Sequence, residues 1–203
     1  MATLTISITI LIVIAAYLMG SVSSAVVVSY LMGFPDPRTD GSGNPGATNV
    51  LRLGGKRAAA ITLVGDLIKG LVPVLLVRLY VDDSPLIIAA VALAAFLGHV
   101  FPVLFGFQGG KGVATALGVI AAMTWPTAAV ALSTWLLVVV TSRYSSLSAL
   151  FAAFLTPIYA WYFTSDPIYT GAIGIISLVI VWRHRSNIRK LIAGTETKIG
   201  EKA

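Results

Sequence analysis

The sequence predicts an all-α integral membrane protein that forms a single polytopic domain over residues 1–203. Apolar residues make up 57% of the chain and Asp, Glu, Lys and Arg together make up 11%, against roughly 25% in an average soluble domain. Long stretches carry no charge, as membrane-spanning helices require. This composition excludes a soluble globular protein, and also a disordered chain, which needs low hydrophobicity and high net charge. Because the chain has no cysteine, disulfide scaffolds, thiol catalysis and Cys-ligated metal sites are excluded too.

The expected spans follow the charge-free stretches of the chain. These are residues 1–35, 58–65, 70–77, 84–108, 112–142, 144–165 and 167–182. The second and third join into one span interrupted by Asp66 and Lys69, because a helix that crosses a bilayer needs ~20 residues. The first run has no basic segment before it and is too long for the apolar part of a signal peptide. We therefore expect the first helix to stay in the protein.

The stretch 112–142 decides the number of spans. It holds Trp125 and Pro126 near its middle; proline breaks helices and tryptophan prefers the membrane interface. As one helix it gives six spans, with 5 basic residues on one side of the membrane and 7 on the other. As two helices it gives seven spans and puts all twelve on one side, with Arg78 toward the other. Since basic residues gather on the cytoplasmic side, the sequence predicts seven transmembrane helices, an N-terminus outside and a C-terminus in the cytoplasm.

This topology puts cytoplasmic loops at about residues 33–57, 107–111 and 143–145 and a cytoplasmic tail at 183–203. The fourth and fifth helices are then short, about 12 to 16 residues or ~18–24 Å at 1.5 Å per residue. Helices of that length cross ~30 Å of hydrocarbon only where the membrane thins or neighbouring helices shield their ends. We expect a dent in the cytoplasmic face around them.

The first cytoplasmic loop carries the motif Gly-Ser-Gly-Asn-Pro-Gly-Ala-Thr-Asn-Val-Leu-Arg over residues 41–52. Its glycines and proline fix a tight path and leave backbone amides open to an anion. Neutral hydrogen-bonding groups come from Ser42, Asn44, Thr48 and Asn49, and Arg52 adds a fork-shaped cation. Such a loop suits a phosphorylated ligand that carries hydroxyl groups. The same residue types make ordinary polar turns, so composition alone leaves both interpretations open.

The second loop places Lys111 among four glycines, Gly106, Gly109, Gly110 and Gly112. Its amides and the positive end of the following helix would form a phosphate seat, with Lys111 as a point charge. A flexible linker is the weaker alternative, because four glycines around one lysine destabilise the helix ends for no evident packing reason. The loop is not a Walker A motif, which needs Gly in place of Phe105 and Ser or Thr in place of Gly112. Magnesium-nucleotide chemistry therefore has no support.

The tail begins with Arg-His-Arg-Ser-Asn-Ile-Arg-Lys-Leu-Ile. Ile188, Leu191 and Ile192 lie at helical spacing, which predicts an interfacial amphipathic helix whose basic residues reach anionic headgroups. That role does not explain His184 and Asn187, which are three residues apart and so share a helical face.

Two charges and a histidine fall inside the expected spans. We expect Asp66 and Lys69 to neutralise each other, and His99 to make a structural hydrogen bond. With two histidines and no cysteine, no metal site is expected.

Three motifs, in this order, resemble one protein family. They are residues 41–52, Gly98-His-Val-Phe-Pro102 followed by Gly109-Gly-Lys-Gly-Val-Ala-Thr115, and Arg183-His184-x-x-Asn187-Ile188 followed by Gly194-Thr-Glu-x-Lys198. Together they resemble the bacterial acyl-phosphate:glycerol-3-phosphate acyltransferases, the PlsY family, over essentially the whole chain.

This resemblance implies an enzyme of phospholipid biosynthesis in the bacterial cytoplasmic (inner) membrane, with its active site facing the cytoplasm. It would transfer a fatty acyl group from acyl phosphate to the 1-hydroxyl of glycerol 3-phosphate, giving lysophosphatidic acid and phosphate, without a metal, a cofactor or acyl-CoA. The implied partners are glycerol 3-phosphate, long-chain acyl phosphate and membrane lipids, with a functional link to the soluble enzyme that makes acyl phosphate, and no nucleic acid.

The resemblance also assigns residues by motif position. The expected catalytic residues are Ser42, Lys111, His184 and Asn187. The expected substrate-binding residues are Arg52, Asn44, Thr48, Gly106, Gly109, Gly110, Gly112 and Ser146. Ser148 is the alternative to Ser146.

The chemistry fits these residue types. Acyl phosphate is an activated mixed anhydride, so positioning and charge stabilisation suffice without a covalent intermediate. We expect direct attack by the substrate hydroxyl, with Lys111 and Arg52 binding phosphates, and Ser42 and Asn187 orienting groups near the carbonyl. His184 is either the base or a hydrogen-bond organiser, and a substrate phosphate oxygen is the other candidate to accept the proton.

Two alternative functions remain at this stage. One is a transporter or binding protein for organic phosphates, and the other is an acyltransferase that uses a thioester donor. Against transport, the sequence has no evident inverted repeat, and its basic residues lie on one side rather than at the midplane.

Overall fold

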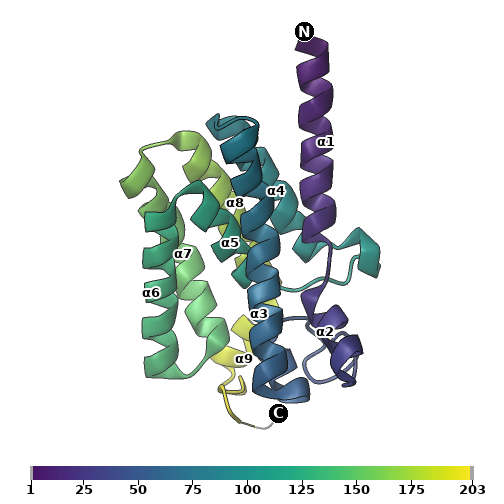
Figure 1. Ribbon diagram of the computed structural model, residues 1–203. Coiled ribbons are helices and arrows are strands. Elements are labelled where there is room, and N and C mark those ends of the chain that lie inside the picture. The colour runs from purple at the N-terminus through teal and green to yellow at the C-terminus, as the bar shows by residue number, and fades with distance from the viewer. Residues whose placement is uncertain (1, 202–203) are drawn as a thin grey trace.

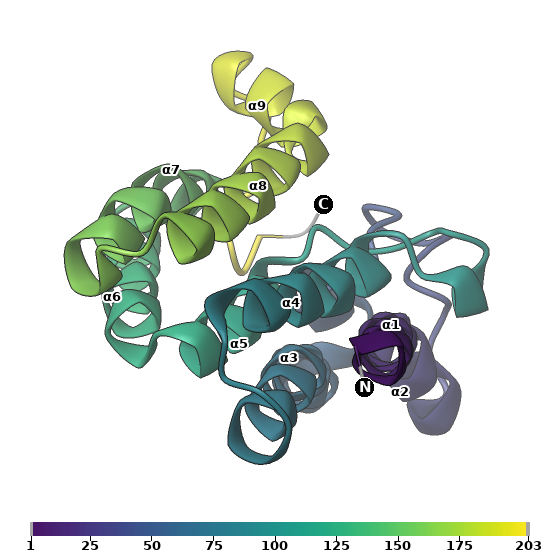
Figure 2. The ribbon, with the colours of Figure 1, turned by 90° about the horizontal axis from the view of Figure 1, so that it is seen from above.

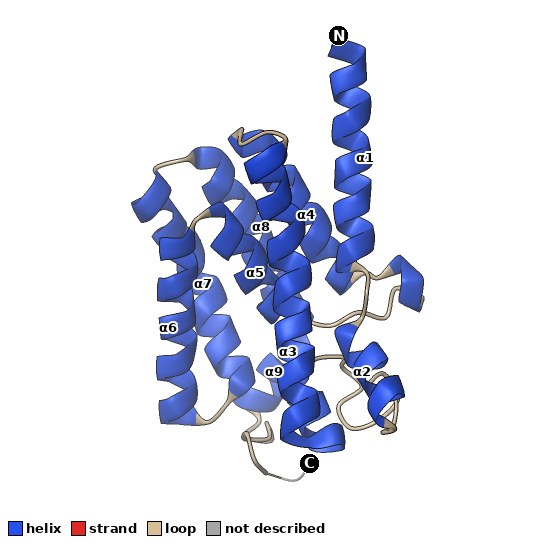
Figure 3. Cartoon of the chain, viewed as in Figure 1, coloured by secondary structure: helices blue, strands red, loops and turns tan. Residues whose placement is uncertain are grey.

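The protein is helical throughout the described chain. The computed structural model describes residues 2–201, with side chains described from Ser7 onward, and these residues contain helices and no strand (Figures 1 and 3). Met1, Lys202 and Ala203, which belong to the expected first span and the expected tail, lie outside the described residues.

Residues 2–201 form nine α-helices and one short 3-10 helix. In chain order these are α1 (Ala2–Gly20), α2 (Ser24–Met32), α3 (Ala47–Tyr80), α4 (Pro85–Val100), η1 (Val103–Phe105), α5 (Val113–Met123), α6 (Trp125–Ser142), α7 (Ser145–Thr164), α8 (Pro167–Arg183) and α9 (Arg185–Ile192).

The first apolar stretch is bent rather than straight. The backbone leaves the helix at residues 21–23, and α1 and α2 meet at an angle of 41°. The break leaves the Val22 carbonyl without a helical partner, and the Lys69 ammonium donates to it at 2.7 Å. An intramembrane charge thus satisfies a backbone group that the bilayer would leave unpaired.

The expected cytoplasmic segment 33–57 is helical in its second half, because α3 begins at Ala47. Inside α3 the backbone breaks at Gly55, where φ is 77° and ψ is −174°. Glycine suits this position because a positive φ strains residues that carry a Cβ. The eight residues before the break therefore form a separate short helix of about two turns.

The predicted break in the stretch 112–142 is present. Helix α5 ends at Met123 and α6 begins at Trp125, with Pro126 in its first turn, where proline's missing N–H costs nothing. The expected lengths are wrong, since α5 has 11 residues and α6 has 18. Arg78 explains how α5 can end early: its Nη1 donates to the carbonyls of Ala122 at 2.8 Å and Met123 at 2.9 Å, two groups that lack helical donors.

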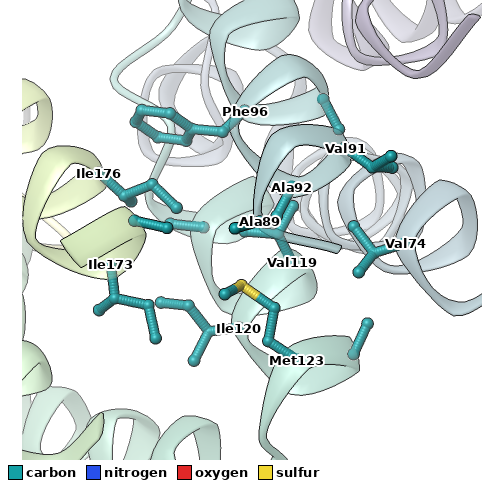
Figure 4. Close-up of a cluster of buried hydrophobic side chains, with 14 of the residues drawn as sticks. Val74, Ala89, Val91, Ala92, Phe96, Val119, Ile120, Met123, Ile173 and Ile176 are labelled. Carbon is teal, nitrogen blue, oxygen red and sulfur yellow. The ribbon is translucent and has the colours of Figure 1, made fainter. Parts of the chain in front are cut away.

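The core lies where α4 meets α3, α5 and α8. Seen from above, α6, α7 and α8 lie to one side and α1 to α3 to the other, with α4 and α5 between them (Figure 2). Phe96 on α4, Met123 on α5 and Ile173 on α8 are among the largest fully buried side chains, and they lie in one apolar cluster (Figure 4).

Glycines allow two helix pairs to approach closely. A methyl group on Gly98 of α4 would come within 2.2 Å of the Tyr17 carbonyl oxygen of α1, and one on Gly118 of α5 within 2.2 Å of the Leu67 carbonyl oxygen of α3. Small residues at such contacts are typical of membrane helices, which associate by close packing.

By length and composition, four helical segments of the described chain could cross a membrane alone, and six could if the bent pairs α1–α2 and α8–α9 each count as one span. Helix α5 is apolar but shorter than this criterion allows.

Candidate active site

Four polar segments, far apart in the sequence, meet at one end of the bundle. They are the loop 33–46, the glycine loop 106–112, the turn 143–144 and the tail from His184. The Arg183 Nη2 donates to the Gly109 carbonyl at 2.6 Å, Thr48 Oγ1 lies 3.3 Å from Ser145 Oγ, and the Ile199 amide donates to the Arg143 carbonyl at 2.9 Å. This end lies opposite the free end of α1 (Figure 1).

A cavity of about 240 Å³ opens between these segments. Its lining residues are Ser42, Asn44, Lys111, Arg183, Arg185, Ser186, Asn187 and Lys190. Four of them are basic and none is acidic, so the cavity favours anions. Four of the predicted site residues lie here, namely Ser42, Asn44, Lys111 and Asn187.

Asn49 holds the first loop in shape. Its side chain is 1% exposed; Oδ1 accepts the Ser42 amide at 2.9 Å, and Nδ2 donates to the carbonyls of Pro37 and Asp40, both at 3.0 Å. Asn49 therefore organises the loop instead of facing the cavity, and its bonds place Ser42 at the cavity wall.

Lys111 is the central cation of the site. Its ammonium donates to Oδ1 of the Asn187 side chain. Burial lowers the pKa of Lys111 to about 8, with nearby cations such as Arg183 and Arg52 adding to the effect and Glu196 opposing it. Arg52 does not line the cavity, but it lies close enough for its charge to act on Lys111.

Glu196 links two of the predicted residues and was not itself predicted. It accepts hydrogen bonds from Ser146 Oγ at 2.6 Å and from Asn187 Nδ2 at 2.7 Å, which extends the network from Lys111. The sequence feature that could have pointed to Glu196 is its negative charge within a mostly basic tail. Ser148 instead donates to the Tyr144 carbonyl of its own helix at 2.8 Å, so Ser146 is the serine in this network.

His184 lies at the junction of α8 and α9, not on a shared helix face with Asn187. It is 3% exposed, and its Nδ1 lies 2.8 Å from the Ile180 carbonyl oxygen. Because a carbonyl only accepts, Nδ1 carries the hydrogen and Nε2 keeps its lone pair. Burial lowers the pKa of His184 to about 4, assisted by the charge of Lys111, so the ring is neutral at neutral pH.

Seven of the eight predicted substrate-binding residues do not line the cavity, and neither does the predicted catalytic residue His184; the seven are Arg52, Thr48, Gly106, Gly109, Gly110, Gly112 and Ser146. Gly106 and Gly112 adopt φ of 61° and 83°, which favours glycine. A methyl group on Gly109 would lie 2.2 Å from the His99 carbonyl oxygen, and one on Gly110 would lie 2.4 Å from His99 Nε2. Contrary to the expectation from the sequence, Gly109, Gly110 and Gly112 therefore have a packing reason.

The intramembrane charges pair as expected, with Lys69 Nζ 2.8 Å from Asp66 Oδ1. His99 does not make the expected hydrogen bond: within residues 2–201 its Nδ1 has no hydrogen-bond partner, and it lies 3.6 Å from Asp66 Oδ1.

Comparison with known proteins agrees with the resemblance of the motifs. The glycerol-3-phosphate acyltransferase family profile matches residues 10–194. A glycerol-3-phosphate acyltransferase of Thioalkalivibrio sulfidiphilus is 60% identical over 190 residues, covering 94% of this chain and 93% of that protein. One of Methylococcus capsulatus is 54% identical over 187 residues, covering 92% and 94%.

Two solved structures are also similar over nearly the whole chain. They are crystal structures of PlsY (YgiH), an integral membrane glycerol 3-phosphate acyltransferase, in a glycerol 3-phosphate form and a lysophosphatidic acid form. Both are 36% identical to this chain and cover 95% of it, and 96% and 95% of their own chains, with TM-scores of 0.90 and 0.88. The chain therefore belongs to the glycerol-3-phosphate acyltransferase family and is a multi-pass membrane enzyme.

Proposed function

We propose that this enzyme transfers a fatty acyl group from acyl phosphate to the 1-hydroxyl of glycerol 3-phosphate, releasing lysophosphatidic acid and phosphate. The cationic cavity carries the proposal. Four basic side chains line about 240 Å³, which suits two phosphate groups, one on each substrate. The related PlsY structures, named for glycerol 3-phosphate and lysophosphatidic acid, support the acceptor and the product.

In this proposal Lys111 and Arg52 bind phosphate, while Ser42 and Asn187 orient groups near the reacting carbonyl. Asn44, Thr48 and Ser146 complete the substrate-binding set. Gly109, Gly110 and Gly112 act through the path of the loop, since their close packing on α4 holds Lys111 at the cavity wall. Gly106 acts through the same path, because its φ of 61° favours glycine.

The acyl carbon forms a bond to O1 of glycerol 3-phosphate as its bond to the phosphate oxygen breaks. His184, with a pKa of about 4, is too weak a base to keep the hydroxyl proton at neutral pH. We assign it the role of hydrogen-bond acceptor through Nε2, and assign the hydroxyl proton to the departing phosphate.

We further propose seven crossings by a single domain, with α5 as the short fourth span, in the bacterial inner membrane. The N-terminus lies outside and the site faces the cytoplasm, where the soluble enzyme that makes acyl phosphate can supply the donor. The chain has no cysteine, so single cysteines at Asp83 and Thr195 test this arrangement. In intact spheroplasts an impermeant maleimide should label Asp83→Cys alone, and labelling of Thr195→Cys instead reverses the orientation.

The donor is tested with purified protein in detergent and labelled glycerol 3-phosphate. Palmitoyl phosphate, palmitoyl-CoA and palmitoyl carrier protein are supplied in separate reactions. Lysophosphatidic acid from the acyl phosphate alone supports the proposal, and product only from a thioester refutes the proposed donor. Trapping an acyl group on Ser42 would refute direct transfer.

A further inference from the structure

A buried polar cluster lies inside the bundle, behind the cavity. Asp66 and Lys69 of α3 and His99 of α4 are 3%, 8% and 6% exposed. Polar groups at such positions are costly in a membrane protein and commonly have a function. Two interactions account for Lys69: it pairs with Asp66 and it donates to the Val22 carbonyl at the α1–α2 break. The roles of Asp66 and His99 follow from what they contact.

Asp66 contacts both flanks of the segment that carries Lys111. On the side before it, the carboxylate faces His99, in the last turn of α4, with 3.6 Å between Oδ1 and Nδ1. On the side after it, the Asp66 backbone carbonyl accepts the Thr115 hydroxyl, in the first turn of α5, at 2.9 Å. One residue of α3 thus lies against both ends of this segment, with its carboxylate at the α4 end and its backbone carbonyl at the α5 end.

The other edge of the His99 ring packs on the glycine loop itself. A methyl group on Gly110 would lie 2.4 Å from Nε2 and 2.9 Å from Cε1 of His99, and 3.1 Å from the Pro45 carbonyl oxygen. Gly110 is therefore held between the ring and the first loop. Lys111 directly follows Gly110 and Asn44 directly precedes Pro45, so a shift of the ring moves two cavity-lining residues.

We propose that Asp66 and His99 form a positioning pair that sets the glycine loop against the first loop and thereby sets the place of the Lys111 ammonium. The pair rests on the proposed role of Lys111 as a phosphate ligand. A polar ring is needed because its Nδ1 edge, facing the carboxylate, fixes the rotation of the ring. An apolar ring of similar size would fill the space without being oriented.

Loop mobility without substrate gives the first test. A nitroxide label on Gln108→Cys, an exposed position in the glycine loop, would be attached to the only cysteine of the chain. His99→Phe keeps a ring and removes both nitrogens, and Asp66→Asn keeps the shape and removes the charge. Thr115→Val reports on the other flank if Asp66→Asn fails to fold. Thr62→Val is the matched control, because Thr62 is buried on α3 one turn from Asp66 and its hydroxyl has no partner among the described residues.

Steady-state kinetics on the unlabelled variants gives the second test. His99→Phe and Asp66→Asn should each raise the KM for glycerol 3-phosphate by about tenfold, as small displacements of binding groups do, and change the KM for the acyl donor much less. Because both act through one loop, the double variant should be no worse than the poorer single variant. Thr62→Val should match the parent in both tests.

The outcomes separate this inference from the proposed function. Label mobility that rises in His99→Phe and Asp66→Asn, but not in Thr62→Val, supports the positioning pair whatever reaction the enzyme performs. A mobile loop with an unchanged KM would refute the phosphate-binding role of Lys111 and leave the pair intact. Unchanged mobility in all variants, or multiplicative losses in the double variant, overturns the pair.

Discussion

Raising the pH from 7 to 9 tests how Lys111 binds phosphate. With a pKa of about 8, Lys111 is about 91% protonated at pH 7 and about 9% at pH 9, a tenfold fall; an ordinary lysine, with a pKa near 10.4, would lose only about 4%. The phosphate of glycerol 3-phosphate stays dianionic over this range, because its second pKa is about 6. The Kd for glycerol 3-phosphate should therefore about double between pH 7 and pH 8 and be about tenfold higher at pH 9 than at pH 7.

Isothermal titration calorimetry of the protein in detergent, without acyl donor, measures this Kd free of any contribution from chemistry. Binding the dianion should also draw protons onto Lys111 near pH 8 to 9, visible as a dependence of the binding heat on the buffer. Lys111→Arg is the matched control, since a guanidinium stays charged throughout this range, and its Kd should not change with pH. A constant Kd to pH 9 in the parent protein, or an equal rise in Lys111→Arg, would refute the reasoning.

Three substitutions probe other parts of the structure. Lys111→Ala should lower kcat/KM by about 100- to 1,000-fold, as loss of one preorganised donor does. The control is Lys198→Ala, which should stay within about twofold of the parent, because the Lys198 ammonium lies over the Tyr144 ring and outside the cavity. Equal steady-state rates for the two variants would remove Lys111 from the site. Gly110→Ala should destabilise the fold by about 1–3 kcal/mol through overpacking and raise the KM for glycerol 3-phosphate. Its control is Gly174→Ala on α8, where a methyl meets nothing within 4 Å, and equal thermal unfolding of the two variants contradicts the packing argument. Arg78→Met should lower the unfolding free energy by about 1–3 kcal/mol, because two carbonyls at the end of α5 lose their donor; an unchanged melting temperature would contradict this.

Local chemistry and charge counting predicted much of the architecture. The break before Pro126 follows from proline itself, and the meeting of the basic segments at one end of the bundle agrees with the expectation that they share one side of the membrane. The bend between α1 and α2 was not predictable, because residues 21–23 contain no helix breaker and the freed Val22 carbonyl is satisfied by Lys69, far along the chain.

The candidate site was likewise predictable only in part from the sequence. Motif residues such as Lys111 and Asn187 lie at the cavity, as their motif positions predicted. The packing role of Gly110 could not be predicted, because it depends on the His99 ring, which only the folded chain brings near. The part played by Glu196 likewise depends on partners from two other segments, Ser146 and Asn187.

The shortness of α5 affects how deep in the bundle the glycine loop lies. Thr115 of α5 is level with Asp66 of α3, and α3 continues about 16 Å beyond that level before its break at Gly55, at 1.5 Å per residue. The end of the glycine loop that enters α5 therefore lies deeper along the bundle than the break in α3. For the proposed reaction, a long-chain acyl phosphate can keep its acyl chain among the lipids while only its phosphate end enters the site. Donor and product then exchange by lateral diffusion within the leaflet, and glycerol 3-phosphate alone arrives from the water. For an enzyme that works this way, the acyl-chain lengths in the product follow those of the donors present in the membrane.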